Sequence, residues 1–182
     1  GGVLDLDLGA GADLTINHVI NINGGELDLT TSAATEWTLA SSATINAAGA
    51  VTSNINSVGE TFNINGTIHV DDNSTLLVSS VSNFAASANI VIDAGGTLNM
   101  VSATYNGGSY TGAGVLRKGA ATIDAATTWS VDTVDLDDGN ATTLNANLTI
   151  NASSVEADGD AVEGTHTINN GAVLTVNAGA SW

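Results

Sequence analysis

The sequence predicts an all-β fold, a right-handed parallel β-helix (β-solenoid) in which short strands stack coil upon coil. Three observations predict it: an internal repeat of about 46 residues, an apolar/polar alternation with a period of two, and the absence of proline from all 182 residues. A central strand uses every backbone N–H in its ladder, so a proline-free chain fits a stack of central strands. Right-handed coiling is the default for parallel crossovers.

Four aromatic residues mark the repeat. Trp37, Phe84, Trp129 and Trp182 are separated by 47, 45 and 53 residues, which divides the chain into repeats 1–37, 38–84, 85–129 and 130–182. Each repeat is too small to bury its own apolar face, so we expect about two coils per repeat and about eight coils in all. We expect the four rings to pack in the core or at corners, above one another along one axis.

Period-two alternation defines the individual strands. These segments predict strands of about 3–6 residues, each with one apolar and one polar face. Clusters rich in Gly, Asn and Asp, such as residues 24–25, 106–108 and 138–140, predict the turns between them. The alternation is found at residues 4–8, 20–23, 27–29, 62–64, 68–70, 98–100, 148–150 and 174–176.

Two other all-β architectures are alternatives. The 92-residue step from Trp37 to Trp129 suggests two tandem β-sandwich domains, and a closed barrel is the third option. The solenoid is favoured because the repeat is only about half a sandwich domain. A recurring Thr-apolar-Asn/Asp triplet also favours it, since stacked coils would place these side chains in hydrogen-bonded ladders along the rod. The triplets begin at Thr15, Thr44, Thr61, Thr97, Thr122, Thr149, Thr167 and Thr175.

The charge balance excludes several classes of partner. The chain has 19 carboxylates but one Arg and one Lys, which gives a formal charge of −17. Nucleic acids and anionic lipid surfaces require clusters of cations, so neither is expected to bind. No apolar run reaches the roughly 18 residues that a membrane helix needs. Without cysteine there are no disulfides or thiolate metal sites. Arg117 and Lys118, the two sites for trypsin-like proteases, lie in a loop-like stretch, and so few sites suit life outside a cell.

The stretch 112–123 resembles a known repeat. Gly112, Gly114, Leu116, Lys118 and Thr122 match the G-x-G-x-L-x-K-x-G-x-G-T-L pattern of bacterial autotransporter passenger domains, with one residue fewer after the Lys and Ala replacing the last Gly. The Gly-, Asn- and Thr-rich composition is also similar to that of such passengers and of large surface adhesins. The resemblance implies a right-handed β-helix exposed on, or released from, a bacterial surface. We expect the chain to be a segment of a longer protein.

Two acidic clusters are candidate calcium sites, because Ca²⁺ prefers carboxylate oxygens. The first cluster lacks the acid that an EF-hand has at its twelfth position, where Ala146 stands, so it is not an EF-hand. The alternative for both clusters is a solvated strand end or loop, and then no cofactor is expected. The first comprises Asp132, Asp135, Asp137 and Asp138, and the second Glu156, Asp158, Asp160 and Glu163.

Histidines and tyrosines provide the remaining candidates. His18, His69 and His166 lack the His-x-x-x-His spacing of a metal site, so we expect them to be surface-facing strand residues. Tyr105 and Tyr110 flank a Gly-rich stretch and are the candidates for contact with a carbohydrate. Among so many acids some pair always meets the spacing of a glycosidase, so the sequence identifies no catalytic residue.

These features predict a non-enzymatic, extracellular structural or adhesive segment of a bacterial surface protein. Uncapped coil ends offer unpaired strand edges, so the expected partners are copies of the chain itself, end to end or side by side, or host and surface glycans. A polysaccharide-binding or polysaccharide-cleaving β-helix is the alternative. Ice binding through threonine arrays is less favoured, because the triplet carries Asn rather than a second Thr.

Overall fold

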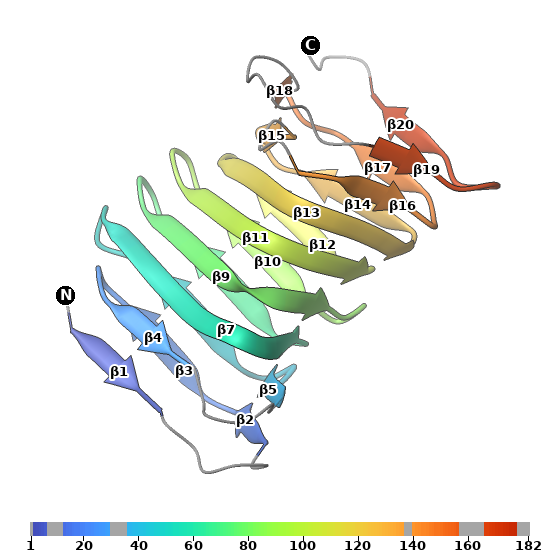
Figure 1. Ribbon diagram of the computed structural model, residues 1–182. Helices are drawn as coiled ribbons and strands as arrows, with labels where there is room; N and C mark the ends of the chain where they lie inside the picture. The colour runs from blue at the N-terminus through green and yellow to red at the C-terminus, as the bar shows by residue number, and fades with distance from the viewer. Residues whose placement is uncertain (1, 7–12, 30–35, 137–139, 157–165, 178–182) are drawn as a thin grey trace.

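The chain forms a parallel β-solenoid of about 7 turns. The computed structural model describes residues 2–6, 13–29, 36–136, 140–156 and 166–177. Within these ranges every strand pair is parallel. Two sheets run the length of the rod, with the N-terminal and C-terminal coils at opposite ends (Figure 1). Because sandwich domains pair their strands antiparallel, the tandem-sandwich alternative is excluded.

Sheet A has twelve described strands and sheet B eight. Sheet A comprises β1 (Val3–Asp5), β2 (Leu14–Ile16), β4 (Glu26–Asp28), β5 (Glu36–Leu39), β7 (Thr52–Ile64), β9 (Thr75–Phe84), β11 (Thr97–Asn106), β13 (Val115–Ala125), β15 (Thr133–Asp135), β16 (Thr142–Leu144), β18 (Ser154–Glu156) and β19 (His166–Ile168). Sheet B comprises β3 (Val19–Ile22), β6 (Thr44–Ala47), β8 (Thr67–Val70), β10 (Asn89–Ile92), β12 (Ser109–Gly112), β14 (Thr127–Ser130), β17 (Leu148–Ile150) and β20 (Leu174–Val176). In the described residues no helix is long and apolar enough to cross a membrane.

Register pairing arranges the inward side chains in columns along the rod. One column of sheet B runs Ile20, Ile45, Ile68, Ile90, Tyr110, Trp129, Ile150 and Val176. One column of sheet A runs Ile16, Leu39, Ile64, Phe84, Tyr105, Ile123, Leu144 and Ile168. The apolar members of such columns form one continuous buried core.

The coil count is close to the prediction but not equal to it. Two coils take the chain from Ile20 to Ile68, and two more take it from Ile68 to Tyr110, so a pair of coils spans close to one predicted repeat. The chain nevertheless makes about 7 turns rather than eight.

The aromatic residues that mark the sequence repeat are core residues. Trp37, Phe84 and Trp129 are fully buried, as predicted, whereas Trp182 lies outside the described residues. The prediction of a single aromatic column is wrong. Trp37 and Phe84 occupy different columns of sheet A, and Trp129 belongs to sheet B.

The aromatic residues do not form one column because the side chains of each coil must fill a core of similar cross-section. A large side chain can fill that core from either sheet. Where sheet B carries Tyr110 and Trp129, the inward positions of β11 and β13 in the same coils include the small Ala103 and Ala121. Where sheet A carries Trp37, sheet B has Ile45. Aromatic residues thus recur along the sequence without occupying equivalent positions.

Four strands of sheet A are longer than predicted: β7 has 13 residues, β9 and β11 have 10 each, and β13 has 11. Their pairing shifts register between Asn56 and Thr61 and between Met100 and Ser102. Such bulges let a strand bend and absorb extra residues without leaving the sheet. These strands therefore continue through the bulges and exceed the predicted length of about 3–6 residues.

The two cations lie within β13 and not in a loop, which corrects the expectation for the protease sites. Because neighbouring strand residues point to opposite faces, Arg117 faces outward and Lys118 is fully buried. Lys118 continues a core column after Met100, and its ammonium group donates a hydrogen bond to the backbone carbonyl of Asn140 at 2.9 Å. Both residues pair with β11, and Arg117 also pairs with β15, so neither lies in the unpaired, accessible backbone that a protease requires.

Candidate functional site

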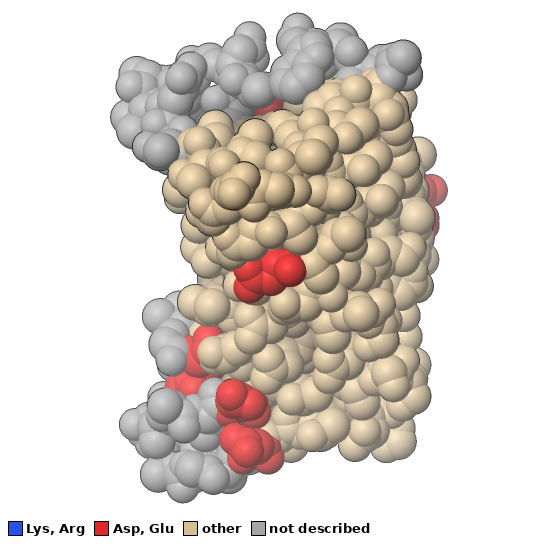
Figure 2. Space-filling view, turned by 90° about the vertical axis from the view of Figure 1, so that its right-hand side faces the viewer, with Lys and Arg blue, Asp and Glu red and all other residues tan. Residues whose placement is uncertain are grey.

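The outward faces of both sheets carry columns of Thr and Asn. In sheet B one such column, which we call the threonine column, is Thr44, Thr67, Asn89, Ser109, Thr128, Thr149 and Thr175. The face in Figure 2 is mostly uncharged, with carboxylates confined to a few separate patches. The threonine column gives sheet B a row of small polar side chains along the rod, despite the large net charge of the chain.

Asn side chains on successive coils are hydrogen-bonded to one another, which confirms the predicted ladders for Asn. The Asn46 amide donates to Asn21 at 2.8 Å, and the Asn83 amide donates to Asn63 at 3.1 Å. Near the C-terminal end the Asn169 amide donates to Asn145 in the same way. Each such bond joins two coils, so the ladders add lateral support to the backbone pairing.

A shallow groove of about 530 Å³ follows one of these ladders. It is lined by Thr38, Asn63, Asn65, Asn83, Ala85, Ala86 and Asn106. Among the described residues, this lining offers amide and hydroxyl groups but no aromatic ring and no carboxylate. The groove can therefore form hydrogen bonds with a neutral polar ligand, and its described lining holds no acid–base pair.

The most concentrated chemistry lies where sheet B strands end, at His69, Asp71 and Asp93. His69 is in β8, Asp71 directly follows β8, and Asp93 directly follows β10 of the next coil. The His69 Nε2 lies 2.9 Å from an Asp93 carboxylate oxygen, and its Nδ1 lies 3.5 Å from Asp71. One nitrogen of the imidazole and one oxygen of each carboxylate all lie within 4.8 Å of one another. All three side chains are partly exposed, with exposed fractions of 33%, 42% and 40%.

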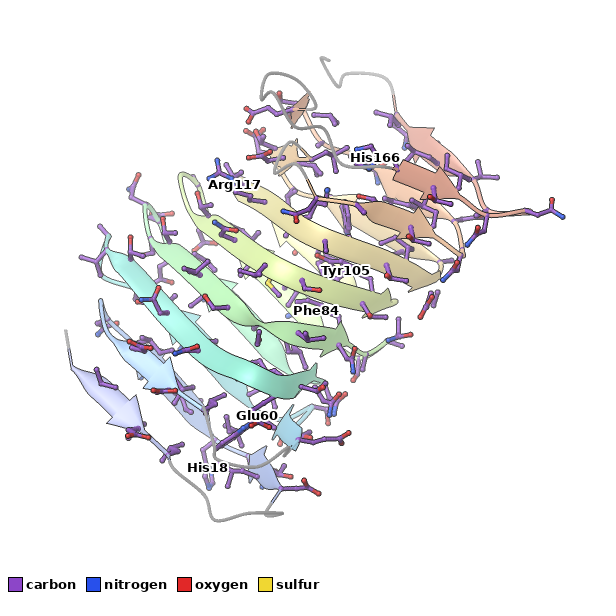
Figure 3. The ribbon with its side chains drawn as sticks, in the orientation of Figure 1. His18, Glu60, Phe84, Tyr105, Arg117 and His166 are labelled. Carbon is purple, nitrogen blue, oxygen red and sulfur yellow. The ribbon has the colours of Figure 1, made fainter. Side chains whose placement is uncertain are left out.

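Sequence reasoning missed this cluster, although two signals could have found it. The first is the His69-x-Asp71 spacing, which puts both side chains on the same face of an extended chain. The second is the coil step, because Val70 pairs with Ile92 and so places Asp93 beside Asp71. His69 faces outward as predicted, and His18 and His166 are exposed near opposite ends of the rod (Figure 3).

Of the predicted calcium ligands, Asp135 is paired with an arginine and most of the others lie outside the described residues. Asp135 is buried and paired with the Arg117 guanidinium, whose Nε lies 2.6 Å from a carboxylate oxygen. An arginine at this distance neutralises the carboxylate and occupies the position of a metal ion, so Asp135 is a structural ion-pair residue. Asp132 and Glu156 are exposed. The other predicted ligands, Asp137, Asp138, Asp158, Asp160 and Glu163, lie outside the described residues.

The prediction of carbohydrate contact by Tyr105 and Tyr110 is contradicted by their burial, at 0% and 1% exposure. Tyr105 stacks on Phe84 with ring centroids 5.2 Å apart, and the two rings come from the neighbouring strands β11 and β9 (Figure 3). Tyr110 packs edge-on against Tyr105 and donates its hydroxyl to the Gly107 carbonyl at 3.1 Å. Both rings occupy inward positions in the alternation of apolar and polar residues along their strands. The Gly-rich stretch between them interrupts this alternation, so the sequence does not reveal it.

The burial of Tyr105 and Tyr110, the two tyrosines of the chain, leads to a testable prediction. Desolvation by burial raises the pKa of Tyr105 above its ordinary value, and it raises the pKa of Tyr110 well above 10.0, with the nearby Tyr105 adding to the effect. In the folded chain both pKa values exceed those in the unfolded chain. The tyrosines therefore favour folding below about pH 10, and this contribution is lost as the pH rises above it.

We expect no tyrosinate absorbance near pH 10 while the circular dichroism of the fold persists, and then a joint appearance of tyrosinate and loss of structure at higher pH. The measurement is an absorbance titration followed in parallel by circular dichroism. A titration midpoint near pH 10 with the fold intact would show that the rings are accessible to solvent.

In comparisons with protein-family models, curated proteins and solved structures, nothing matches the chain. The fold class therefore rests on the register and burial of the described residues alone.

Proposed function

We propose that this chain is a non-enzymatic, extracellular structural segment of a bacterial surface protein, which acts as a stiff and adhesive shaft. The observation that supports the proposal best is the continuous core, whose columns run through about 7 turns with each strand paired to the next coil. Such a stack transmits load along its axis and uses its interior for packing. A shaft needs this construction, whereas an enzyme on the same fold needs a concave catalytic site in addition.

Composition and local sequence support an extracellular bacterial setting. The stretch that resembles autotransporter passengers begins at Gly112 and Gly114, and both lie where coils approach closely. A Cβ atom on Gly112 would lie 2.0 Å from the Ile92 carbonyl oxygen, and one on Gly114 would lie 2.5 Å from that of Asp93. The close approach of neighbouring coils therefore explains why both motif positions are occupied by glycine. Placement of both cations within the paired strand β13 limits trypsin-like cleavage, which favours persistence outside a cell.

End-to-end association is the form of self-assembly that the ends of the rod support. Within the described residues, the sheet A column includes Ile168, which is 53% exposed, and the sheet B column includes the half-buried Ile20. Leu174, the register partner of the buried Leu148, is exposed as well. A second copy stacked on either end would continue these columns and pair the strand edges.

The proposal is tested by three measurements on the same preparation. We expect resistance to trypsin and proteinase K under native conditions, no release of reducing ends from a panel of neutral and acidic polysaccharides, and sedimentation that grows with concentration, with rods in negative-stain micrographs. Catalytic turnover of any polysaccharide would contradict a non-enzymatic shaft. A particle that stays monomeric at all concentrations would contradict self-association only.

The second candidate function is binding of a neutral polysaccharide, which the Asn-lined groove favours. Asn63 and Asn83 are register partners on successive coils, so their amides lie about 4.8 Å apart along the rod and can bond to neighbouring hydroxyls of one glycan chain. Binding on a glycan array that is lost in Asn63→Ala and retained in Asn145→Ala, a ladder residue outside the groove, would establish this function.

A further inference from the structure

The cluster of His69, Asp71 and Asp93 bridges two successive coils. Asp71 and Asp93 hold equivalent positions, since Val70 and Ile92 are register partners. The backbone N–H groups of both donate to the preceding coil at 2.9 Å, which fixes where their side chains start. His69 lies on the outward face beside them, with its ring between the two carboxylates.

Charge makes this arrangement unusual for a purely structural ladder. Like charges on directly neighbouring strands are destabilising, and the exposed Asp72 adds a third carboxylate nearby. The chain's one Arg and one Lys lie elsewhere: Arg117 pairs with Asp135, and Lys118 is buried in β13. The column of His69 carries no other charged residue over the neighbouring coils, since it runs from Asn46 through His69 and Val91 to Thr111.

We propose that His69, Asp71 and Asp93 bind a divalent transition-metal ion, with Zn²⁺ as the best fit, and that the ion clamps the coils of β8 and β10 together. An imidazole nitrogen suits Zn²⁺ and is a poor ligand for Ca²⁺ or Mg²⁺, which take oxygen ligands. Three protein ligands leave a fourth, solvent-exposed position for water.

The geometry requires only a small adjustment. Tetrahedral bonds of about 2.0–2.1 Å place neighbouring donor atoms about 3.3 Å apart. The present donor atoms lie within 4.8 Å of one another on partly exposed side chains. These side chains can rotate towards a shared ion while their backbones stay paired.

The experiment is isothermal titration calorimetry of the metal-free chain with zinc chloride at neutral pH. We expect one tight site, lost or weakened by more than about tenfold in His69→Ala and in Asp93→Asn. Asp72→Asn is the matched control, because it removes a neighbouring charge outside the cluster and should leave the affinity nearly unchanged. His18→Ala controls for exposed histidines in general.

A second readout separates chelation from a folding defect. Co²⁺ should give visible d–d absorption with the original chain and with Asp72→Asn but not with His69→Ala, while circular dichroism shows all three folded. The proposal is overturned if zinc does not bind at millimolar concentration, or if His69→Ala binds as tightly as the original chain. It is also overturned if Asp72→Asn weakens binding as much as Asp93→Asn, which would indicate a diffuse electrostatic effect. None of these outcomes bears on the shaft proposal, which does not depend on this site.

Discussion

Trp129→Ala is expected to lower the free energy of unfolding by about 3–5 kcal/mol, because it removes a fully buried indole and leaves a cavity that the stacked coils cannot close. The ring packs edge-on against Tyr105 and Tyr110, with centroids 5.3 and 6.5 Å away. Contacts across the core from both sheets are therefore lost together. The measurement is guanidinium unfolding at equilibrium, followed by circular dichroism.

Trp129→Phe is the matched control. It keeps most of the buried ring and removes an indole N–H that has no hydrogen-bond partner in the described part of the chain. We expect it to cost much less than the alanine variant, since loss of an unsatisfied polar group offsets part of the lost volume. Equal costs for the two variants would contradict the assignment of this ring to a tightly packed core.

Gly112→Ala is expected to destabilise the chain by about 2–5 kcal/mol and to loosen the pairing of β12 with β10. Gly112 has a φ of 125°, a conformation that residues with a Cβ atom rarely adopt. The added Cβ would lie 2.0 Å from the Ile92 carbonyl oxygen and 2.8 Å from its carbon, so one backbone must move away from the other. Thermal unfolding gives the size of the effect, and hydrogen exchange of β10 and β12 shows its place.

Gly171→Ala separates the cost of backbone strain at a positive φ from the cost of a clash between the added Cβ and a neighbouring coil. Gly171 also has a positive φ, of 90°, but no atom of the described residues lies within 4 Å of a Cβ built on it. Strain alone should cost about 1–2 kcal/mol there. If Gly112→Ala costs no more than Gly171→Ala, then the coils do not approach as closely at Gly112 as the structure shows.

The stacking of the coils was predictable because its causes are local. Alternation of apolar and polar residues sets one face inward, the absence of proline permits pairing on both sides, and Thr and Asn on the outward face form ladders. Each can be read without knowing which residues become neighbours.

Features that depend on register were not predictable in this way. The length of a coil varies along one column, since the step from Tyr110 to Trp129 is shorter than the step from Ile150 to Val176. A sequence repeat therefore cannot say which rings are equivalent. Alternation indicates which way a side chain points, whereas its partner depends on the length of the coil.

Two contacts between successive coils also could not be predicted from the sequence. Lys118 faces the core, and its outward neighbour Arg117 pairs with Asp135 of the next coil. The His69 cluster likewise needs the pairing of β8 with β10, since Asp93 lies one whole coil further along the chain. Neither contact is visible until the register of the coils is known.

The most direct test of the stacked, in-register coils is a series of distances along the threonine column. The chain has no cysteine, so pairs of cysteines introduced for spin labels are specific. With one label at Thr44 and the second at Thr128, Thr149 or Thr175, the partners lie four, five and six coils away. Pulsed electron paramagnetic resonance should give about 19, 24 and 29 Å, a rise of about 4.8 Å per coil. Distances that do not increase in this order, or that rise by unequal steps, would contradict a single solenoid.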